Sequence, residues 1–495
     1  MIPLDADQAG RALGVGALAG PVTRVSVDSR TLQPGDLFVA LRGERFDGHA
    51  YVKAALAAGA VGAVVEKKAW ERLRKAGSAA PGPIYEVDDT LQALGSLARE
   101  VRRSSGALVF AVTGSVGKTS TKDLLRAMSS RVLRVTATAG NQNNEVGVPL
   151  TLLALEPDTQ AVVTEMGMRG HGQIAALAAV AEPDVGVITN VHPVHLELLG
   201  TIEGIAGAKA ELPAGVRPGG AAVVPGECAP LEPHLDGCDC RVVRFGVGAE
   251  ARGADVRGWL EEGERQGEYI LALRWPEGEA RVATAYLPKH TVENAVAAAA
   301  ACYAAGLPVA ACAAGIADVR FSEGRGQVLE LGSLCLIDDT YNANPAAVRA
   351  AVDDLVRLAA RRGGRPVAVL GDMLELGPDS ERFHRDAGAY AAEAGVQALW
   401  GVGERAEAMV WGFSAWHAAK GRPGAQVGAA HVSSSGESGE IIAGLRRGDV
   451  VLLKASRSVR LENVVRSVVG EAKAGRWGSA SMPQDGAPDD SGENR

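Results

Sequence analysis

Short apolar runs alternate with helical patterns along most of this chain. Residues 108–113 (Leu-Val-Phe-Ala-Val-Thr) form a run typical of a buried parallel strand. A glycine-rich loop follows, and after it Leu124, Leu125, Met128 and Val132 stand at helical spacing. Similar apolar runs near 161–166, 185–190, 221–225, 334–340, 366–373, 396–403 and 449–454 are separated by helical stretches. This rhythm predicts an α/β fold with mostly parallel sheets.

The pattern divides the chain into three blocks. A chain of 495 residues is too long for a single core. A polar stretch at 321–326 is expected to act as a hinge. We predict a small N-terminal α/β domain that binds substrate (1–104), a central mononucleotide-binding domain with a parallel sheet (105–318), a C-terminal Rossmann-like domain (319–474), and a disordered tail (475–495) that lacks apolar periodicity.

Composition and charge indicate a globular protein and exclude some classes of function. The hydrophobic share of 47% and the charged share of 22% are those of an ordinary globular protein. A formal net charge of -8 argues against a broad nucleic-acid surface, and no apolar run is long enough to span a membrane. No signal-peptide pattern opens the chain, so we expect a cytoplasmic protein whose six cysteines are reduced thiols.

Residues 113–120 predict a phosphate-binding loop. Glycines at 114 and 117 allow backbone N–H groups to turn toward an oxyanion, a lysine at 118 can reach the terminal phosphates, and the hydroxyl of Thr119 can ligate Mg²⁺. The loop is a short variant, because Val112 stands where the common motif has its first glycine. The predicted nucleotide-binding residues are Thr113, Gly114, Ser115, Val116, Gly117, Lys118, Thr119 and Ser120.

Several further segments occur in one order. They read DSRTLQPGDLFVALRGERFDGH, TGSVGKTSTKD, GNQNNEVGVPLTLL, TEMGM, ITNVHPVHLELLGTIEGIAGAKAEL, IDDTYNANP, LGDMLELG and LKASRSVRLE. Together they resemble the Mur ligases over about residues 20 to 470. The segments GNQNNEVGVPLT, DDTYNANP and LGDMLELG are most similar to those of the family member that adds a dipeptide last.

The resemblance implies an ATP-dependent amide ligase. It would join D-alanyl-D-alanine to UDP-N-acetylmuramoyl-tripeptide through an acyl phosphate, in cytoplasmic peptidoglycan precursor synthesis. Two alternatives stay open within related ligases: the diaminopimelate- or lysine-adding enzyme, and a folylpolyglutamate synthase. From a different class, a P-loop ATPase or nucleotide-gated binding protein would use the same loop without ligation.

The catalytic residues expected from the resemblance surround the phosphate loop. Glu165 follows the strand at 161–164 and so lies at the carboxyl end of the sheet, where α/β sheets bind ligands. The resemblance implies that Lys209 is carbamylated; an unmodified lysine on a phosphate or on the surface is the alternative. The implied catalytic set is Lys118, Glu165, His195 and Lys209, and the ligands of two Mg²⁺ ions are Thr119, Glu165, His195 and Lys209. His192 stands where the family usually has glycine.

Further binding residues are carried over from the family motifs. His290, Asn294, Arg325 and Asp339 would contact ATP, with a helix cap as the alternative for Asn294 and a solvated hinge residue as that for Arg325. Ser29, Arg30, Asp47 and His49 would surround UDP, although packing explains them equally well. Asn141, Asn143 and Asn144 would hold the muramoyl peptide, or serve as turn residues. Lys454 and Arg457 would meet the carboxylate of the dipeptide. We expect a monomer.

Overall fold

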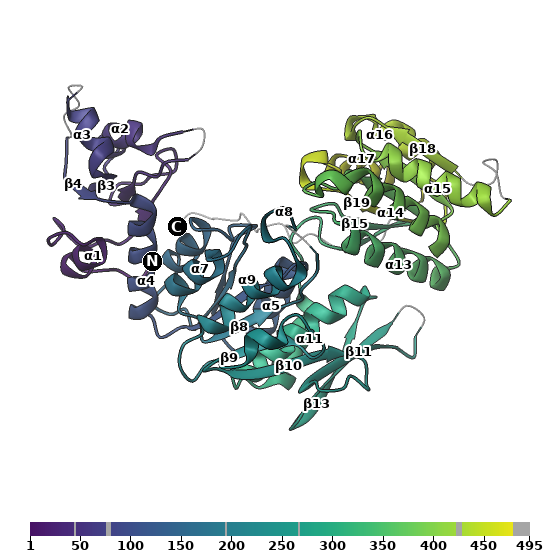
Figure 1. The fold of residues 1–495 in the computed structure, drawn as a ribbon, viewed down its shortest axis with the longest axis horizontal. Helices are drawn as coiled ribbons and strands as arrows, with labels where there is room; N and C mark the ends of the chain where they lie inside the picture. Colours follow the sequence, from purple (N-terminus) through teal and green to yellow (C-terminus); the bar gives the residue numbers. More distant parts are fainter. Residues whose placement is uncertain (44–45, 76–80, 194–195, 266–267, 422–427, 479–495) are drawn as a thin grey trace, which may run out of the picture. The chain divides into compact units, whose positions relative to one another are not determined.

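The computed structural model describes residues 1–43, 46–75, 81–193, 196–265, 268–421 and 428–478 (Figure 1). Contacts divide the chain into two compact units, Met1–Ser322 and Glu323–Arg495. The described residues form three sheets: one in the N-terminal part of the first unit, one in the rest of that unit and one in the second unit. The predicted α/β class with parallel sheets is confirmed.

The first sheet is small and wholly parallel. Its strands, in the order β1-β2-β3-β4, are Val25–Ser26, Leu37–Val39, Gly62–Glu66 and Ile84–Val87. The helices are α1 (Ala6–Leu13), η1 (Gly48–Tyr51), α2 (Val52–Ala57), α3 (Lys67–Lys75) and α4 (Thr90–Ser104). Helix α4 contacts α1 and also α6 (Gly147–Leu153) and α7 (Gln173–Ala181), so one apolar core joins the first two sheets. The first two predicted domains therefore lie in a single compact unit.

The central sheet has nine strands in the order β13-β12-β11-β10-β9-β8-β5-β7-β6. The strands are β5 (Leu108–Thr113), β6 (Val135–Ala137), β7 (Ala161–Glu165), β8 (Val185–Ile188), β9 (Ala221–Pro225), β10 (Arg241–Val247), β11 (Val256–Glu262), β12 (Tyr269–Trp275) and β13 (Gly278–Thr284). Pairing is parallel from β6 to β11, whereas β12 and β13 are antiparallel additions. In this sheet, β6 and the four strands β10 to β13 were not predicted individually from the sequence.

Helices cover both faces of this sheet. They are α5 (Lys118–Ser129), α6 (Gly147–Leu153), α7 (Gln173–Ala181), α8 (Leu196–Leu199), α9 (Ile202–Ala214), α10 (Glu232–Leu235), α11 (Lys289–Ala304), α12 (Val309–Ala313) and η2 (Ala314–Asp318). Residues 295–302 of α11 are all buried and mostly alanine, and α11 packs on α5. Small side chains let the two helices approach closely. Residues 289–318 form three separate elements, α11, α12 and η2.

The second unit contains a doubly wound sheet in the order β14-β15-β19-β16-β17-β18. The strands are β14 (Gln327–Leu331), β15 (Leu334–Asp339), β16 (Arg365–Gly371), β17 (Ala398–Val402), β18 (Gly428–Val432) and β19 (Asp449–Lys454), and only β14 is antiparallel. The helices are α13 (Pro345–Arg362), η3 (Gly377–Asp379), α14 (Ser380–Ala394), α15 (Glu407–Ala419), η4 (Ser435–Glu437), α16 (Ser438–Gly444), η5 (Arg457–Val459) and α17 (Glu462–Lys473).

The ordered core of this unit extends past residue 475, the position at which the sequence predicts a disordered tail to begin. The side chain of Trp477 is 2% exposed and belongs to the apolar core of the unit. Its carbonyl oxygen accepts hydrogen bonds from the N–H and the hydroxyl of Ser333. One buried indole outweighs the polar composition around it. Residues 479–495 of the predicted tail lie outside the described residues.

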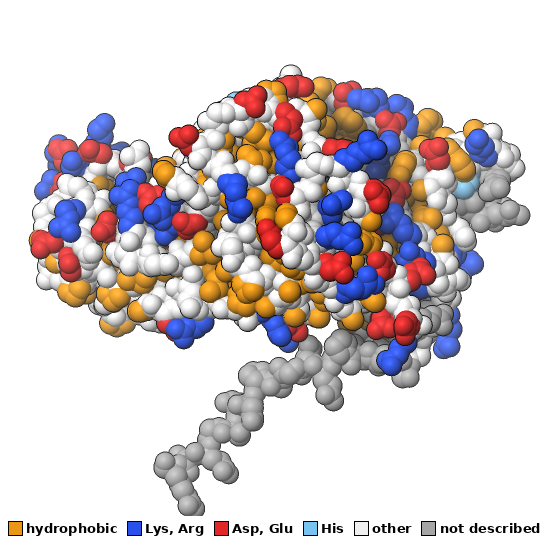
Figure 2. All heavy atoms as spheres, turned by 90° about the horizontal axis from the view of Figure 1, so that it is seen from below, with side chains coloured by type: hydrophobic (Ala, Val, Ile, Leu, Met, Phe, Trp, Pro, Cys, Tyr) orange, Lys and Arg blue, Asp and Glu red, His pale blue; other side chains and the backbone are white. Residues whose placement is uncertain are grey.

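The surface carries both signs of charge. On the face in Figure 2, Lys and Arg side chains are intermingled with Asp and Glu. None of the helices in the described part of the chain combines the length and the apolar character needed to cross a bilayer.

Candidate active site

The phosphate loop joins an interior strand of the nine-stranded sheet to a helix. Strand β5 lies between β7 and β8, and α5 starts at Lys118 directly after the loop. Gly117 caps α5 with φ +84°, and a Cβ there would lie 2.3 Å from Oδ1 of Asn294. Only glycine fits both requirements. The ammonium group of Lys118 donates to the carbonyl oxygen of Gly114 at 2.8 Å.

The residues that follow β8 hold this loop in shape. The side chain of Asn190 forms two hydrogen bonds with the backbone of Val116. Its Oδ1 accepts the N–H at 2.9 Å, and its Nδ2 donates to the carbonyl oxygen at 3.0 Å. Thr189 donates to the same carbonyl at 2.6 Å. The sequence reasoning missed both residues, although their place directly after a strand next to β5 was a signal that could have identified them.

His192 completes this support through its backbone. Its N–H donates to Oγ of Ser115, and that hydroxyl donates to the carbonyl of His192, both at 2.9 Å. The His192 side chain itself is exposed. Because only main-chain atoms take part, histidine is accommodated where the resemblance led us to expect glycine.

A buried carboxylate faces the start of α5. Glu165 is the last residue of β7, in register with Val112 of β5, and it is 1% exposed. One of its oxygens accepts the hydroxyl of Thr119 at 2.8 Å, and the other accepts the side-chain amide of Asn143 at 2.7 Å. The structure thus brings together Thr119 and Glu165, and adds Asn143 to them.

The other two asparagines of the 141–144 loop are not bound to this carboxylate. Asn144 stabilises the turn before α6, since its Oδ1 accepts the N–H groups of Val146 and Gly147 at 3.3 and 2.9 Å. Asn141 is exposed. Asn144 therefore has the turn role that was the alternative in the sequence analysis.

Lys209 on α9 is a buried amine whose pKa is influenced by the charge of Lys118. It is 1% exposed, and among the described residues it has no hydrogen-bond or ion-pair partner. Burial, and after it the charge of Lys118, lower the pKa of Lys209 well below the ordinary lysine value. His195, the other predicted catalytic residue here, lies outside the described residues.

The donor set fits a magnesium ion that is shared with phosphate. Glu165 and Thr119 offer oxygen atoms side by side, and oxygen is the ligand that Mg²⁺ prefers. Among the residues that the structure describes, no three His, Cys, Asp or Glu side chains form a metal-binding group. Mg²⁺ commonly uses one or two carboxylates together with substrate phosphates rather than a cage made only of protein.

Asn294 lies against the phosphate loop from α11. It is the sixth residue of that helix and is 4% exposed, so it is not a helix cap. Its Nδ2 is buried without a hydrogen-bond partner among the described residues. A buried donor without an acceptor destabilises the fold, and a bound ligand could provide the missing acceptor. His290 is the second residue of the same helix and is half-buried.

The predicted UDP residues differ in their accessibility. The ring of His49 is fully used inside the domain: Nε2 accepts the N–H of Glu66 at 2.9 Å, and Nδ1 lies 2.6 Å from Oδ1 of Asp47. Both ring nitrogens of His49 thus have partners inside the domain, which favours the packing alternative for this residue. The Arg30 side chain is 86% exposed, and its guanidinium lowers the pKa of Asp28 to about 2. Ser29 is half-buried.

In the second unit, two predicted residues meet at the carboxyl edge of the sheet. Asp339 ends β15 and Lys454 ends β19, in direct register. The ammonium group of Lys454 donates to Asp339 at 2.5 Å and to the carbonyl of Asn342 at 2.9 Å, and Lys454 is 3% exposed. The resemblance led us to expect these side chains on different ligands, but the structure pairs them.

Tyr341 lies next to two predicted arginines. The guanidinium carbon of Arg325 is 3.6 Å from the centre of its ring, and that of Arg457 is 5.6 Å away. Cations over an aromatic face attract its electrons. Arg457 keeps 61% of its side chain exposed, with Glu462 at 3.8 Å. It is therefore the more accessible of the two cations predicted for the dipeptide.

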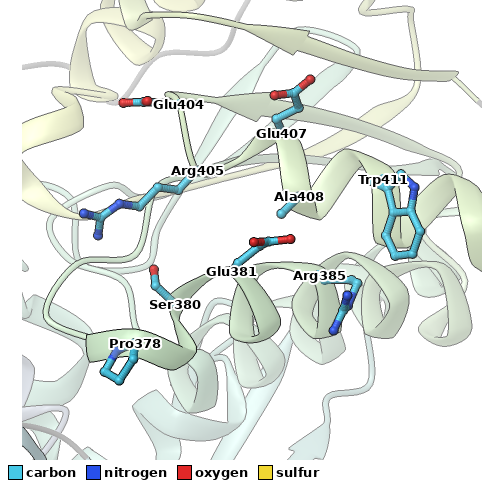
Figure 3. Close-up of a pocket in the computed structure, with 9 residues that line it drawn as sticks. All are labelled: Pro378, Ser380, Glu381, Arg385, Glu404, Arg405, Glu407, Ala408 and Trp411. Carbon is cyan, nitrogen blue, oxygen red and sulfur yellow. The ribbon is translucent and has the colours of Figure 1, made fainter.

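A separate hollow of about 740 Å³ lies between α14 and α15 (Figure 3). None of the predicted site residues lines it. Its lining carries both signs of charge and consists of Pro378, Ser380, Glu381, Arg385, Glu404, Arg405, Glu407, Ala408 and Trp411.

Comparisons with known protein families and with individual relatives all match this chain to Mur ligases. Three protein-family models match: "Mur ligase family, catalytic domain" at residues 21–102, "Mur ligase middle domain" at 112–302, and "Mur ligase, glutamate ligase domain" at 324–457. UDP-N-acetylmuramoyl-tripeptide–D-alanyl-D-alanine ligase of Bacillus subtilis is 34% identical over 92% of this chain and 96% of its own length. The enzyme of that name from Escherichia coli is 33% identical over 90% and 93%.

Solved structures give the same result. The crystal structure of MurF from Acinetobacter baumannii superposes with a TM-score of 0.80 and 29% identity, over 94% of this chain and 99% of that one. MurF ligase of Thermotoga maritima, in complex with ADP, gives a TM-score of 0.77 and 28% identity over 91% and 98%. The chain therefore belongs to the Mur ligase family, and within it to the UDP-N-acetylmuramoyl-tripeptide–D-alanyl-D-alanine ligases.

Proposed function

We propose that this chain joins D-alanyl-D-alanine to UDP-N-acetylmuramoyl-tripeptide and converts ATP to ADP and phosphate. The observation that carries this proposal is the contact between Thr119 and Glu165 beside the phosphate loop, in a chain that matches a ligase of this name over 92% of its length. A second magnesium ion, a cytoplasmic location and a monomeric state are further parts of the proposal.

The reaction has two steps. The carboxylate of the tripeptide attacks the γ-phosphorus of ATP, so that an acyl phosphate forms and ADP leaves. The dipeptide amine then attacks the acyl carbon, the new amide bond forms and phosphate departs. Both steps bring anions together, and the cationic Lys118 and the N-terminus of α5 lower that repulsion at the phosphates.

Magnesium would be held by Thr119 and Glu165 in this proposal, with His195 and Lys209 as ligands of a second ion. Bound Mg²⁺ supplies charge neutralisation at the phosphate and carboxylate oxygens. Asn143 orients Glu165 by its hydrogen bond at 2.7 Å. A neutral, buried amine at Lys209 can add carbon dioxide, which releases a proton and leaves an anionic carbamate with oxygen ligands.

Binding of the substrates is divided among the remaining residues. Asn294 and His290 would contact the adenosine part of ATP, and Asp339, held by Lys454, would accept its ribose hydroxyls. Arg325 would add positive charge at the γ-phosphate. Ser29, Arg30 and Asp47 would contact UDP, and Asn141 the muramoyl peptide. Arg457 would pair with the terminal carboxylate of the dipeptide.

Phosphate release tests the ligase function directly. We expect release only when ATP, the UDP-linked tripeptide and D-alanyl-D-alanine are all present, because the acyl phosphate needs its acceptor. Parallel assays use tripeptides ending in diaminopimelate or lysine, and single amino acids in place of the dipeptide. Steady ATP hydrolysis without either substrate would instead indicate a P-loop ATPase.

Replacing Arg457 with alanine will weaken binding of the dipeptide selectively. We expect KM for D-alanyl-D-alanine to rise by about 10-fold or more, because a charge-assisted hydrogen bond is lost, while KM for ATP changes little. Arg466→Ala, which removes an exposed arginine from α17, is the matched control. Equal increases in both constants would argue against this role for Arg457.

A further inference from the structure

The segment that leads out of the first unit follows the helix of the phosphate loop. Near the end of α5, a Cβ placed on Gly315 of η2 would lie only 2.3 Å from the carbonyl oxygen of Ala127, so the two backbones touch. Just beyond α5, Arg131 and Asp318 form an ion pair at 3.0 Å. The path from η2 therefore starts at the C-terminal end of α5.

The same segment is tied to α5 again, closer to the phosphate loop. Oδ2 of Asp123 accepts the backbone N–H of Ser322 at 2.8 Å. Ser322 is the last residue of the first unit. Asp123 is five residues from Lys118, which is about 7.5 Å along a helix. The chain thus leaves the unit beside the first turns of the helix whose start forms the phosphate site.

Asp123 is itself held firmly in place. It is 8% exposed, and one of its oxygens lies 3.1 Å from the ammonium group of Lys122. Lys122 is 2% exposed and donates to the carbonyl of Thr138 at 3.1 Å. The hydroxyl of Thr138 accepts the N–H of Glu165 at 3.0 Å. A connected network therefore links the end of the unit with the acidic residue of the phosphate site.

We propose that Asp123 is a positioning residue that fixes the point about which the second unit moves during the reaction. The inference rests on the proposed function, because a ligase must exclude water from its acyl phosphate and domain closure does this. A fixed pivot lets the second unit close in a single direction. This matters because a small displacement of the reacting groups lowers the rate of the chemical step strongly. Asp123 makes none of the phosphate-loop hydrogen bonds described above, so we expect ATP binding to be little affected by its replacement.

The Arg131–Asp318 pair provides a matched control. It joins the same two segments, but its side chains are 49% and 61% exposed. Exposed ion pairs contribute little to stability. Loss of that pair should leave the pivot intact, whereas loss of the buried acceptor at Asp123 leaves the amide of Ser322 without its partner.

The test compares Asp123→Ala, Asp123→Asn and Arg131→Ala in the full chain. For Asp123→Ala we expect kcat to fall about 10-fold, with the Kd for ATP within about twofold of the parent. Asp123→Asn should recover most of this rate, because an amide oxygen accepts the same N–H. Amide hydrogen exchange over residues 316–322 should accelerate in Asp123→Ala only. Should that variant not fold, Asp123→Ser, whose side chain is too short to reach Ser322, takes its place.

Two results would overturn the inference. One is unchanged exchange over residues 316–322 or an unchanged kcat in Asp123→Ala. The other is an equal loss of kcat and ATP affinity that Asp123→Asn does not repair, since this indicates general packing. The exchange measurement needs no substrate. It therefore judges the anchor separately from the proposed function, which fails only if the parent chain releases no phosphate with all three substrates.

Discussion

Ligation will fall at least about 100-fold when Glu165 is replaced by glutamine, because one preorganised electrostatic partner at a reacting phosphate is commonly worth that much. Glutamine keeps the volume of the side chain but removes the negative charge. Among the described residues, the side-chain oxygens of Glu165 accept hydrogen bonds from Thr119 and Asn143 and form no ion pair, so we expect the fold to tolerate loss of the charge. The measurement is kcat for phosphate release at saturating Mg²⁺ and ATP, together with the midpoint of urea unfolding.

Asp449→Asn is the control for loss of a buried carboxylate. Asp449 is 1% exposed and pairs with Arg365 at 2.7 Å, at the amino end of β19 and hence at the edge of the sheet opposite to the predicted site residues. We expect this variant to lose stability and to keep its kcat, since breaking a buried pair is destabilising. A Glu165→Gln variant that is stable and keeps the kcat of the parent chain would show that the charge of Glu165 is not needed for catalysis.

Replacing Lys209 with alanine will also reduce ligation at least about 100-fold, and added formate or acetate will restore part of the rate. The loss follows because a carbamate at this position would supply a negative charge next to the phosphate site. Rescue follows because alanine leaves a cavity where a small carboxylate can replace the lost anion. Phosphate release measured over a series of formate concentrations checks both parts of the prediction.

Lys122→Met separates this effect from the loss of any buried lysine. Lys122 is as deeply buried as Lys209, but it has an acidic neighbour and two carbonyl acceptors within 3.5 Å. Lys209 has no such partners among the described residues, and its burial lowers its pKa and so favours the neutral amine that can form a carbamate. Formate should therefore not rescue Lys122→Met. Failure of every small carboxylate to rescue Lys209→Ala would favour the alternative of an unmodified lysine on phosphate.

The phosphate loop and the parallel strands were predictable from the sequence for a local reason. A buried parallel strand needs an apolar run, and the loop after β5 needs glycines and a lysine within a few residues. The position of Glu165 at the end of β7 was predictable in the same way, because the carboxyl ends of parallel strands share one edge. The Thr119–Glu165 contact confirms this placement at the edge.

The partners of the remaining residues could not be predicted locally. Three examples are the hydrogen bonds between Asn190 and Val116, between His49 and Glu66, and between Lys454 and Asp339. Each joins residues that are distant in the sequence and meet only in the folded chain. Sequence motifs identify residue types that recur together, but they do not indicate which donors and acceptors are already satisfied.

By itself, the sequence determined the class of fold, the nucleotide loop and the family, because these depend on short runs of residues whose chemistry is local. The tertiary structure decided which side chains are buried, which are already paired, and where the chain leaves its first unit. Those properties arise only when strands come into register and helices pack, since burial and hydrogen-bond satisfaction belong to the whole folded chain.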